Sequence, residues 1–368
     1  MADAHIATGR SAKGPIFIVG PMGSGTTLLR LIVDSHDNIA IAQETSIMRG
    51  YLAHKWIPFS KAGAWYRRLG WSDEELDDRM REFYTGMFER FAREQGKQRW
   101  GDKTPWHTWH LRQASELFPD AVFVATIRHP GAVAASVSGR FDWSWRRCVR
   151  HWVANTTELV HRGGELGDRF LLCRYEDLVL EPESTLRELF EWLGEPWSPR
   201  LLEHHLVHSE RGTPPRVEGS SRSDEPISAS RISSWTQNVT EENWRVLRQE
   251  AGALAPFYGY DVDAPDELQP MSVAGSSRRR TLTGAEVNTR RKQFQDLAEL
   301  DLSFTPWAGN RMLKPQLLRQ LGRALRAERE LQGTPPPPAP RRSVVARART
   351  LVTRARHRVR AGGGQPRR

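Results

Sequence analysis

The stretch from residue 15 to residue 34 restricts the fold of this chain more than any other. It reads PIFIV, then GPMGSG, then TTLLRLIVD. A short apolar run that stops at Gly and Pro is typical of a buried strand, and the helical spacing of apolar residues after the turn is typical of an amphipathic helix. A glycine-rich turn between the two gathers backbone N–H groups at a helix N-terminus, where they bind anions. The sequence therefore predicts a phosphate-binding loop.

Two later segments repeat this order. Residues 121–141 read AVFVATI and then RHPGAVAASVSGRF, and RFLLCRYEDL at 169–178 is a third strand candidate, followed by a helix at 182–194 with Pro near its start and Gly at its end. The alternation predicts an α/β fold, a P-loop-type three-layer sandwich with a mostly parallel central sheet. Its ligands would bind outside the carboxyl ends of the strands. Helical insertions at 46–98 and 143–165 are expected to cap that site.

Charge divides the chain into two parts. Residues 265–368 hold 22 of the 54 Lys and Arg residues but 8 of the 44 Asp and Glu residues. We expect an N-terminal arm over 1–14, the main domain over 15–264, and a basic extension, helical or disordered, over 265–368 with a Pro-rich linker at 334–340. Residues 343–360 have the pattern of a basic amphipathic helix, which suits an anionic membrane surface, nucleic acid or an acidic partner. A solubilising extension is the alternative.

The cysteines and histidines predict neither a disulfide framework nor a metal site. Cys148 and Cys173 are too few for either, and fit a reducing compartment. His204 and His208 stand four residues apart, as metal ligands on a helix can, but no carboxylate motif accompanies them.

The distribution of apolar residues predicts where the protein works. The first 20 residues contain no long apolar segment, and nowhere do about 18 uncharged apolar residues run together. We therefore expect a cytoplasmic protein, peripheral to a membrane if its basic extension binds one. A homodimer is compatible with the sequence.

The loop GPMGSGTT departs from the Walker pattern at one position. Gly20 and Gly25 stand where the pattern has glycines, but Thr26 replaces the Lys. That Lys reaches the β- and γ-phosphates of nucleoside triphosphates, so its absence weakens the interpretation as a kinase or NTPase. The remaining features suit an anion that is bound by backbone amides.

Further motifs follow the loop, in the order AQETS (42–46), GDKTPWH (101–107), TIRHPGAVAASVSGRF (126–141), the RYEDL segment (174–197), SRISSW (230–235) and GYD (259–261). With the loop, they resemble the sulfotransferases that use 3'-phosphoadenosine 5'-phosphosulfate (PAPS), in the branch of tyrosylprotein sulfotransferases and bacterial relatives. PAPS has a 5'-phosphosulfate that fits a backbone cradle, a 3'-phosphate that needs a second anion site, and no γ-phosphate that calls for Mg²⁺. The resemblance thus implies PAPS as co-substrate and no required metal.

The resemblance also implies site residues. Glu44 would be the base for the acceptor hydroxyl, Lys103 would stabilise the developing charge, and Ser233, with Ser234 as the alternative, would contribute to the same step. Ser136 and Arg140 lie one helical turn apart and so share a face, and Arg suits phosphate through bidentate geometry. The donor-binding residues implied in this way are Gly23, Ser24, Gly25, Thr26, Thr27, Arg128, Ser136, Arg140 and Tyr175.

One position departs from the resembled family, which usually has Arg or Lys where this chain has Gly23. Three interpretations remain open. Lys103 and the helix N-terminus carry the charge alone, or Arg30 or Arg49 moves in, or activity is reduced.

The sequence thus predicts an enzyme that transfers a sulfuryl group from PAPS to a hydroxyl acceptor by in-line displacement. A phenol or tyrosyl group, a sugar and a lipid all remain candidate acceptors, and tryptophans near Lys103 and Arg140 either form aromatic walls for the acceptor or fill the helical cap. The alternatives are a P-loop kinase of a small hydroxyl substrate, and a catalytically weak nucleotide-binding protein that acts through its basic tail.

Overall fold

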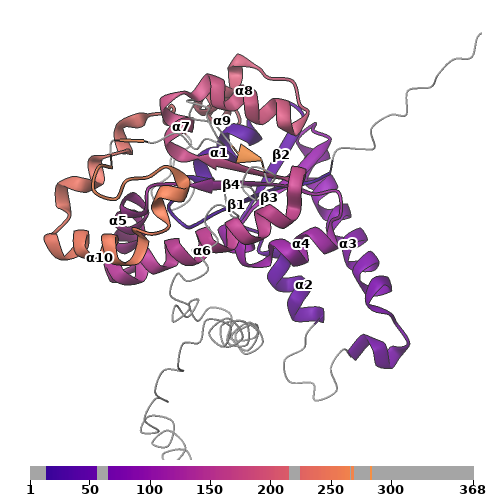
Figure 1. Cartoon of the computed structure of the whole chain (residues 1–368). Helices are drawn as coiled ribbons and strands as arrows, with labels where there is room; N and C mark the ends of the chain where they lie inside the picture. The colour runs from indigo at the N-terminus through magenta and orange to yellow at the C-terminus, as the bar shows by residue number, and fades with distance from the viewer. Residues whose placement is uncertain (1–13, 56–64, 215–223, 266, 269–281, 284–368) are drawn as a thin grey trace, which may run out of the picture. The chain divides into compact units, whose positions relative to one another are not determined.

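Five parallel strands form the centre of the fold (Figure 1). The computed structural model describes residues 14–55, 65–214, 224–265, 267–268 and 282–283. The strand order is β2-β3-β1-β4-β5-β6, and β6 pairs antiparallel with β5. The strands are β1 Ile16–Val19, β2 Ile39–Gln43, β3 Arg99–Lys103, β4 Val122–Ile127, β5 Phe170–Arg174 and β6 Leu282–Thr283. The predicted α/β fold with a mostly parallel sheet is confirmed.

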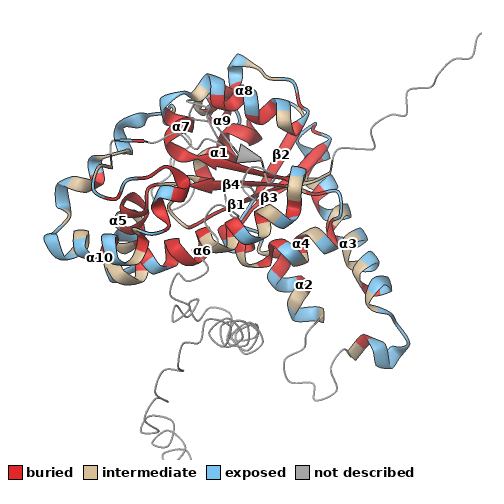
Figure 2. Cartoon of the chain, viewed as in Figure 1, coloured by how far each residue is buried: buried red, intermediate tan, exposed pale blue. Residues whose placement is uncertain are grey.

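Helices cover both faces of this sheet. Ile16 and Ile18 of β1 pack with α1 and α8, whereas Phe17 and Val19 belong to the core formed with α3, α4, α5, α6 and α10. Figure 2 shows the strands and the inner faces of these helices as buried. The α-helices are α1 Thr26–Asp34, α2 Ile47–Lys55, α3 Asp73–Glu94, α4 Leu111–Leu117, α5 Pro130–Phe141, α6 Trp145–Leu166, α7 Tyr175–Leu180, α8 Pro182–Leu193, α9 His204–Glu210 and α10 Glu241–Ala251. The three layers follow from the period of two along each buried strand.

Short 3₁₀ helices connect several of these elements. They are η1 Trp65–Leu69, η2 Pro105–His110, η3 Gly167–Arg169, η4 Pro199–Glu203, η5 Ala229–Arg231, η6 Ser234–Asn238 and η7 Ala255–Tyr258. The predicted insertion 46–98 contains α2, η1 and α3, and the insertion 143–165 is formed by α6, so both insertions are helical where described.

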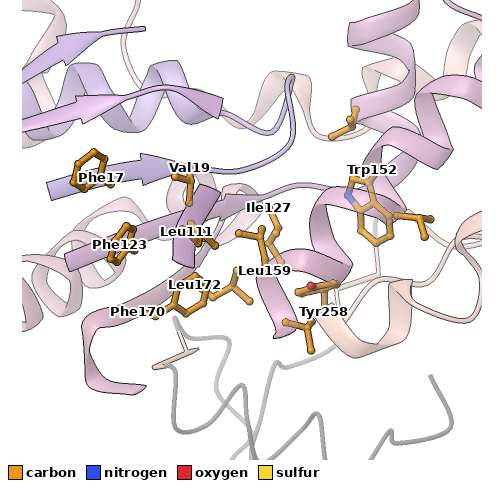
Figure 3. Packing of buried hydrophobic residues seen from close by; sticks show 14 of the residues in the cluster. Phe17, Val19, Leu111, Phe123, Ile127, Trp152, Leu159, Phe170, Leu172 and Tyr258 are labelled. Atoms are coloured by element: carbon orange, nitrogen blue, oxygen red, sulfur yellow. The ribbon is translucent and has the colours of Figure 1, made fainter. Parts of the chain in front are cut away.

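The larger core extends to the carboxyl end of the sheet (Figure 3). Phe17 stacks on Phe123 with ring centroids 5.5 Å apart. Trp152 of α6 is fully buried, meets Tyr258 edge to face, and donates its indole N–H to the backbone oxygen of Arg128 at 2.8 Å. Because Arg128 directly follows β4, this bond attaches the site end of the sheet to the packed core.

The sequence predicted one strand too long and did not predict β3. In the segment 169–178, β5 ends at Arg174 and α7 begins at Tyr175. The Arg174 guanidinium donates to both carboxylate oxygens of Asp177, at 3.0 and 2.7 Å, and this contact closes the first helical turn. Acidic residues also favour a helix N-terminus through the helix dipole.

The structure tests little of the predicted extension. Leu282 and Thr283 of β6 come from the segment 265–368 and join the sheet. The Pro-rich linker at 334–340 and the basic amphipathic segment at 343–360 lie outside the described residues. In the part of the chain that is described, no helix combines the length and apolarity needed to cross a bilayer.

Candidate active site at the carboxyl ends of the strands

The five parallel strands deliver predicted site residues to one edge of the sheet. β1 leads into the glycine loop, β2 into Glu44 and β4 into Arg128, while Lys103 ends β3 and Tyr175 follows β5. A cavity of about 380 Å³ opens at this edge. The predicted residues that line it are Gly23, Gly25, Thr26, Thr27, Glu44, Arg128, Ser136, Arg140 and Tyr175.

The glycine loop presents backbone to this cavity. Gly25 is the N-cap of α1 at φ 94° and supplies no side-chain cap, so the amides of the first helical turn remain for a ligand. Gly23, at φ 84°, lies against α5, where an added Cβ would be 3.2 Å from Ser136 Oγ. The loop and α5 therefore form adjoining walls.

Ser24 is placed differently from its neighbours. Its side chain is fully buried, its hydroxyl donates to Pro21 O at 2.7 Å, and its Oγ lies 2.9 Å from Thr126 Oγ1. Its N–H also donates to Pro21 O, at 3.1 Å. Ser24 does not line the cavity and instead shapes the loop, so its predicted contact with the donor stays a prediction.

The side chains around Arg128 form a basic wall of the cavity, in contrast to the backbone wall of the loop. Its guanidinium carbon lies 4.3 Å from the ring centroid of Tyr175, and its side chain donates to the backbone oxygen atoms of Gly23 and Arg231. Burial raises the pKa of the Tyr175 hydroxyl, and Arg128 opposes this rise only in part, so the hydroxyl stays a neutral donor. With Ser136 and Arg140 on α5, this wall can bind a second anion.

Buried polar residues to which the sequence assigned no role hold the turn that follows Arg128. Glu176 Oε1 accepts from the N–H of His129 at 2.9 Å, and Glu176 Oε2 accepts from the Tyr260 hydroxyl at 2.8 Å. His129 Nδ1 in turn accepts from the N–H of Gly131 and caps α5. The motifs RYEDL and GYD, although far apart in the chain, thus support the turn between β4 and α5.

Glu44 and Lys103 form an ion pair at the cavity. Lys103 Nζ lies 2.8 Å from Glu44 Oε1 and 3.4 Å from Thr27 Oγ1. The side chain of Lys103 is 0% exposed, whereas that of Glu44 is 46% exposed. Lys103 therefore lies behind Glu44 and Thr27, two residues that line the cavity, and does not line it itself. A carboxylate that faces the cavity with an ammonium group behind it suits proton abstraction next to developing negative charge.

Ser233 is not among the residues that line this cavity. It is half-buried just before η6 and does not line the cavity, and Ser234 is exposed. The residues between 224 and 235 that line the cavity are Glu225, Pro226, Ser228 and Arg231. The predicted catalytic role of Ser233 stays a prediction.

Neither of the two arginines proposed to compensate for Gly23 lines the cavity. Arg30 is buried in α1, Arg49 is exposed in α2, and neither lines the cavity. Arg231 does, where its side chain pairs with Glu225 at 3.4 Å. The positive charge that contacts Gly23 thus comes from Arg128, whose guanidinium donates to the Gly23 backbone oxygen.

The tryptophans divide between site and core. Trp106 and Trp143 line the cavity together with Phe141, whereas Trp100 and Trp152 are buried in the core and Trp145 packs on Trp235. Trp100 and Trp152 therefore have packing roles, and an acceptor-binding role of Trp106 and Trp143 stays a prediction.

His204 and His208 of α9 are buried, and His208 contacts a neighbouring element of the fold. Among the described residues, no group of three His, Cys, Asp or Glu side chains is arranged to hold a metal ion. Burial lowers the pKa of His204 to about 3, so its ring is neutral. His208 Nε2 lies 2.9 Å from Leu31 O and connects α9 to α1.

Comparison with known proteins identifies the family. The model described as "Sulfotransferase family" matches residues 15–199, half of the chain. Protein-tyrosine sulfotransferase 1 of Danio rerio is 29% identical over 301 residues, covering 75% of this chain and 84% of that protein. The Homo sapiens protein of that name is 29% identical over 287 residues, covering 73% and 76%. The sulfotransferase domain of the Synechococcus PCC 7002 olefin synthase aligns over 66% of this chain and 97% of that one, at 21% identity and a TM-score of 0.44. The matched residues include the glycine loop, Glu44, Lys103, Arg128 and Tyr175, and the chain belongs to the sulfotransferase family.

Proposed function

We propose that this protein transfers the sulfuryl group of PAPS to a hydroxyl acceptor. The observation that carries the proposal is that one cavity adjoins three features: an anion-binding helix N-terminus, a second basic wall around Arg128, and the Glu44–Lys103 pair. The first two suit the 5'-phosphosulfate and the 3'-phosphate of one nucleotide. The third suits the chemistry.

In the proposed reaction, Glu44 takes the proton of the acceptor hydroxyl as the acceptor oxygen attacks sulfur. The new S–O bond forms while the bond from sulfur to the bridging oxygen breaks, and its electron pair stays on the 5'-phosphate of the departing 3'-phosphoadenosine 5'-phosphate (PAP). Lys103 and the first amides of α1 stabilise that charge. Charged and dipolar groups that are already in position lower the energy of such a transition state most where water is excluded.

A phenolic hydroxyl, such as that of a tyrosyl side chain, is the proposed acceptor class. Trp106, Phe141 and Trp143 line the same cavity as Glu44, and flat aromatic side chains stack well on a phenol ring. The relatives named above are protein-tyrosine sulfotransferases. Turnover of a tyrosine-containing peptide in preference to sugar and lipid alcohols would support this class, and the reverse preference would contradict it.

Thermal denaturation with PAP, ADP and ATP tests the donor site. A ligand that binds only the folded state at 100 times its dissociation constant adds about 2.7 kcal/mol of stability. We expect PAP to raise Tm clearly more than ADP or ATP does, without added Mg²⁺. No rise with saturating PAP would contradict the proposal, and turnover that requires ATP and Mg²⁺ would favour a kinase.

Arg140→Ala should selectively weaken recognition of the 3'-phosphate. A hydrogen bond to a charged group contributes about 1.5–3 kcal/mol, so we expect PAP affinity to fall by about tenfold or more. The affinity for adenosine 5'-phosphate, which lacks the 3'-phosphate, should be unchanged in calorimetric titrations. Arg245→Ala is the control, because Arg245 is an exposed arginine of α10 that pairs with Glu242 away from the cavity. Equal losses for both nucleotides would place Arg140 at another part of the donor.

A further inference from the structure

The segment that carries Glu44 makes several backbone hydrogen bonds to one other segment, residues 102–107. Backbone N–H groups between the end of β2 and the start of α2 donate to residues 102–107. The bonds are Glu44 N–H to Lys103 O (2.8 Å), Thr45 N–H to Asp102 Oδ1 (3.2 Å), Ser46 N–H to Thr104 Oγ1 (3.3 Å) and Met48 N–H to His107 Nε2 (3.4 Å). Three of these four acceptors are side-chain atoms, so side chains of the GDKTPWH motif determine the path of the chain at Glu44.

Asp102 is at the centre of these contacts. Its side chain is 0% exposed, and Oδ1 also accepts from the Thr45 hydroxyl at 2.7 Å. Its other oxygen, Oδ2, lies 3.1 Å from Nδ1 of His107, which is buried as well. His107 Nε2 accepts a hydrogen bond from the Met48 N–H, which leaves Nδ1 as the ring nitrogen that faces Asp102.

The carboxyl group of Asp102 is ionised in this environment. Burial by itself would raise its pKa, but the His107 ring, 3.1 Å from Oδ2, and the hydrogen bond from the Thr45 hydroxyl outweigh burial and hold the pKa below its usual value. An ionised acceptor makes stronger hydrogen bonds than a neutral one does, which suits a group that must hold backbone in place.

The backbone at Glu44 needs such support. Glu44 has φ 42° and Ser46 has φ 56°, both in the left-handed region. This region costs a residue other than glycine about 1–2 kcal/mol and persists only where the surroundings impose it. Since side chains alternate along a strand, two consecutive β3 residues act on different parts of this segment. Lys103 contacts the Glu44 side chain, and Asp102 holds the backbone that follows it.

We propose that Asp102, oriented by His107, is a positioning residue that keeps Glu44 in its left-handed conformation with the carboxylate on Lys103 Nζ. The inference rests on the proposed function only in that it makes Glu44 the base. Asp102 does not line the cavity and acts through Glu44.

A kinetic double-mutant cycle separates this role from general damage. Asp102→Asn should lower kcat by about 10–100-fold with KM for PAPS and Kd for PAP within about twofold. In the Glu44→Gln background, the same change should cost less than about threefold, because the positioned base is already lost. Asp34→Asn is the matched control, since Asp34 is a buried carboxylate that accepts from the N–H of Ile41, the middle residue of β2, at 2.8 Å. It should lower stability and leave kcat unchanged. Equal losses from Asp102→Asn in both backgrounds would overturn the proposal.

Hydrogen exchange gives a second readout that needs no turnover. The peptide containing residues 44–48 should exchange its amide hydrogens at least about tenfold faster in Asp102→Asn. Thr45→Ala, at an exposed position, should also make this peptide exchange faster. Asp34→Asn should not accelerate this peptide more than the rest of the sheet. Unchanged exchange in Asp102→Asn would overturn the inference, whereas absent turnover by the unmodified protein would count only against the proposed function.

Discussion

Replacing Glu44 with Gln is expected to lower kcat by about 10²–10⁴-fold, the range that a positioned general base contributes. Gln keeps the size of the side chain and a hydrogen-bonding oxygen for Lys103, but it cannot take the acceptor proton. Donor binding should change little, because the loop amides and the wall around Arg128 remain. The measurement is sulfuryl transfer from PAPS to a phenolic acceptor, together with the Kd for PAP.

Glu116→Gln is the matched control for this variant. Glu116 pairs with Arg112 at 2.8 Å, the distance between Glu44 and Lys103, and its side chain is 55% exposed, against 46% for Glu44. It lies on α4 and does not line the cavity. We expect kcat of the control to stay within about twofold of the unmodified protein. If Glu44→Gln kept more than about a tenth of the kcat of the unmodified protein, Glu44 would not be the general base.

The second large effect is expected from Gly25→Ala in the loop. Gly25 has φ 94°, which costs alanine about 1–2 kcal/mol, and the new Cβ would lie 2.5 Å from Cδ2 of Tyr175. The ring must move, at the typical overpacking cost of about 1–3 kcal/mol. We expect a lower Tm and a loss of PAP affinity of about 10–100-fold, because the amides of α1 and the Tyr175 hydroxyl would both shift.

Gly70→Ala separates the two causes. Gly70 follows η1 with φ 86° and has no atom within 4 Å of an added Cβ. Alanine at this position therefore has the same unfavourable backbone conformation as at Gly25, but no clash with a neighbouring side chain. Thermal denaturation and PAP titration of both variants provide the comparison. If Gly25→Ala binds PAP as tightly as Gly70→Ala does, the contact between the loop and Tyr175 has no part in donor binding.

Local signals account for what could be predicted of the fold. The apolar run of β1, the turn at Gly20 to Gly25 and the helical spacing of α1 are neighbours in the chain, so their pattern is complete without the rest of the molecule. The same holds for β4 and α5, and for this reason Ser136 and Arg140 were correctly predicted to share one helix.

β3 could not be predicted in this way. Its sequence RWGDK has one large apolar residue and ends in two charges, yet all five residues are buried. It is a strand because β1 and β2 pair with it on both sides, and Gly101 fits there because an added Cβ would lie 2.4 Å from the Ile16 backbone oxygen. These partners are 60 to 85 residues away in the chain, so no local pattern reports them.

By itself, the sequence determined the glycine loop, the α/β alternation and the types of chemical group at the site, because each is written in neighbouring residues. Only the tertiary structure decided which of these groups meet. It buried Lys103 behind Glu44, placed Arg128 over Tyr175, turned Ser24 into the interior, left Ser233 off the cavity and gave Asp102 its hold on the Glu44 segment. The physical reason is that strand order and burial set these contacts, and both depend on residues far apart in the chain.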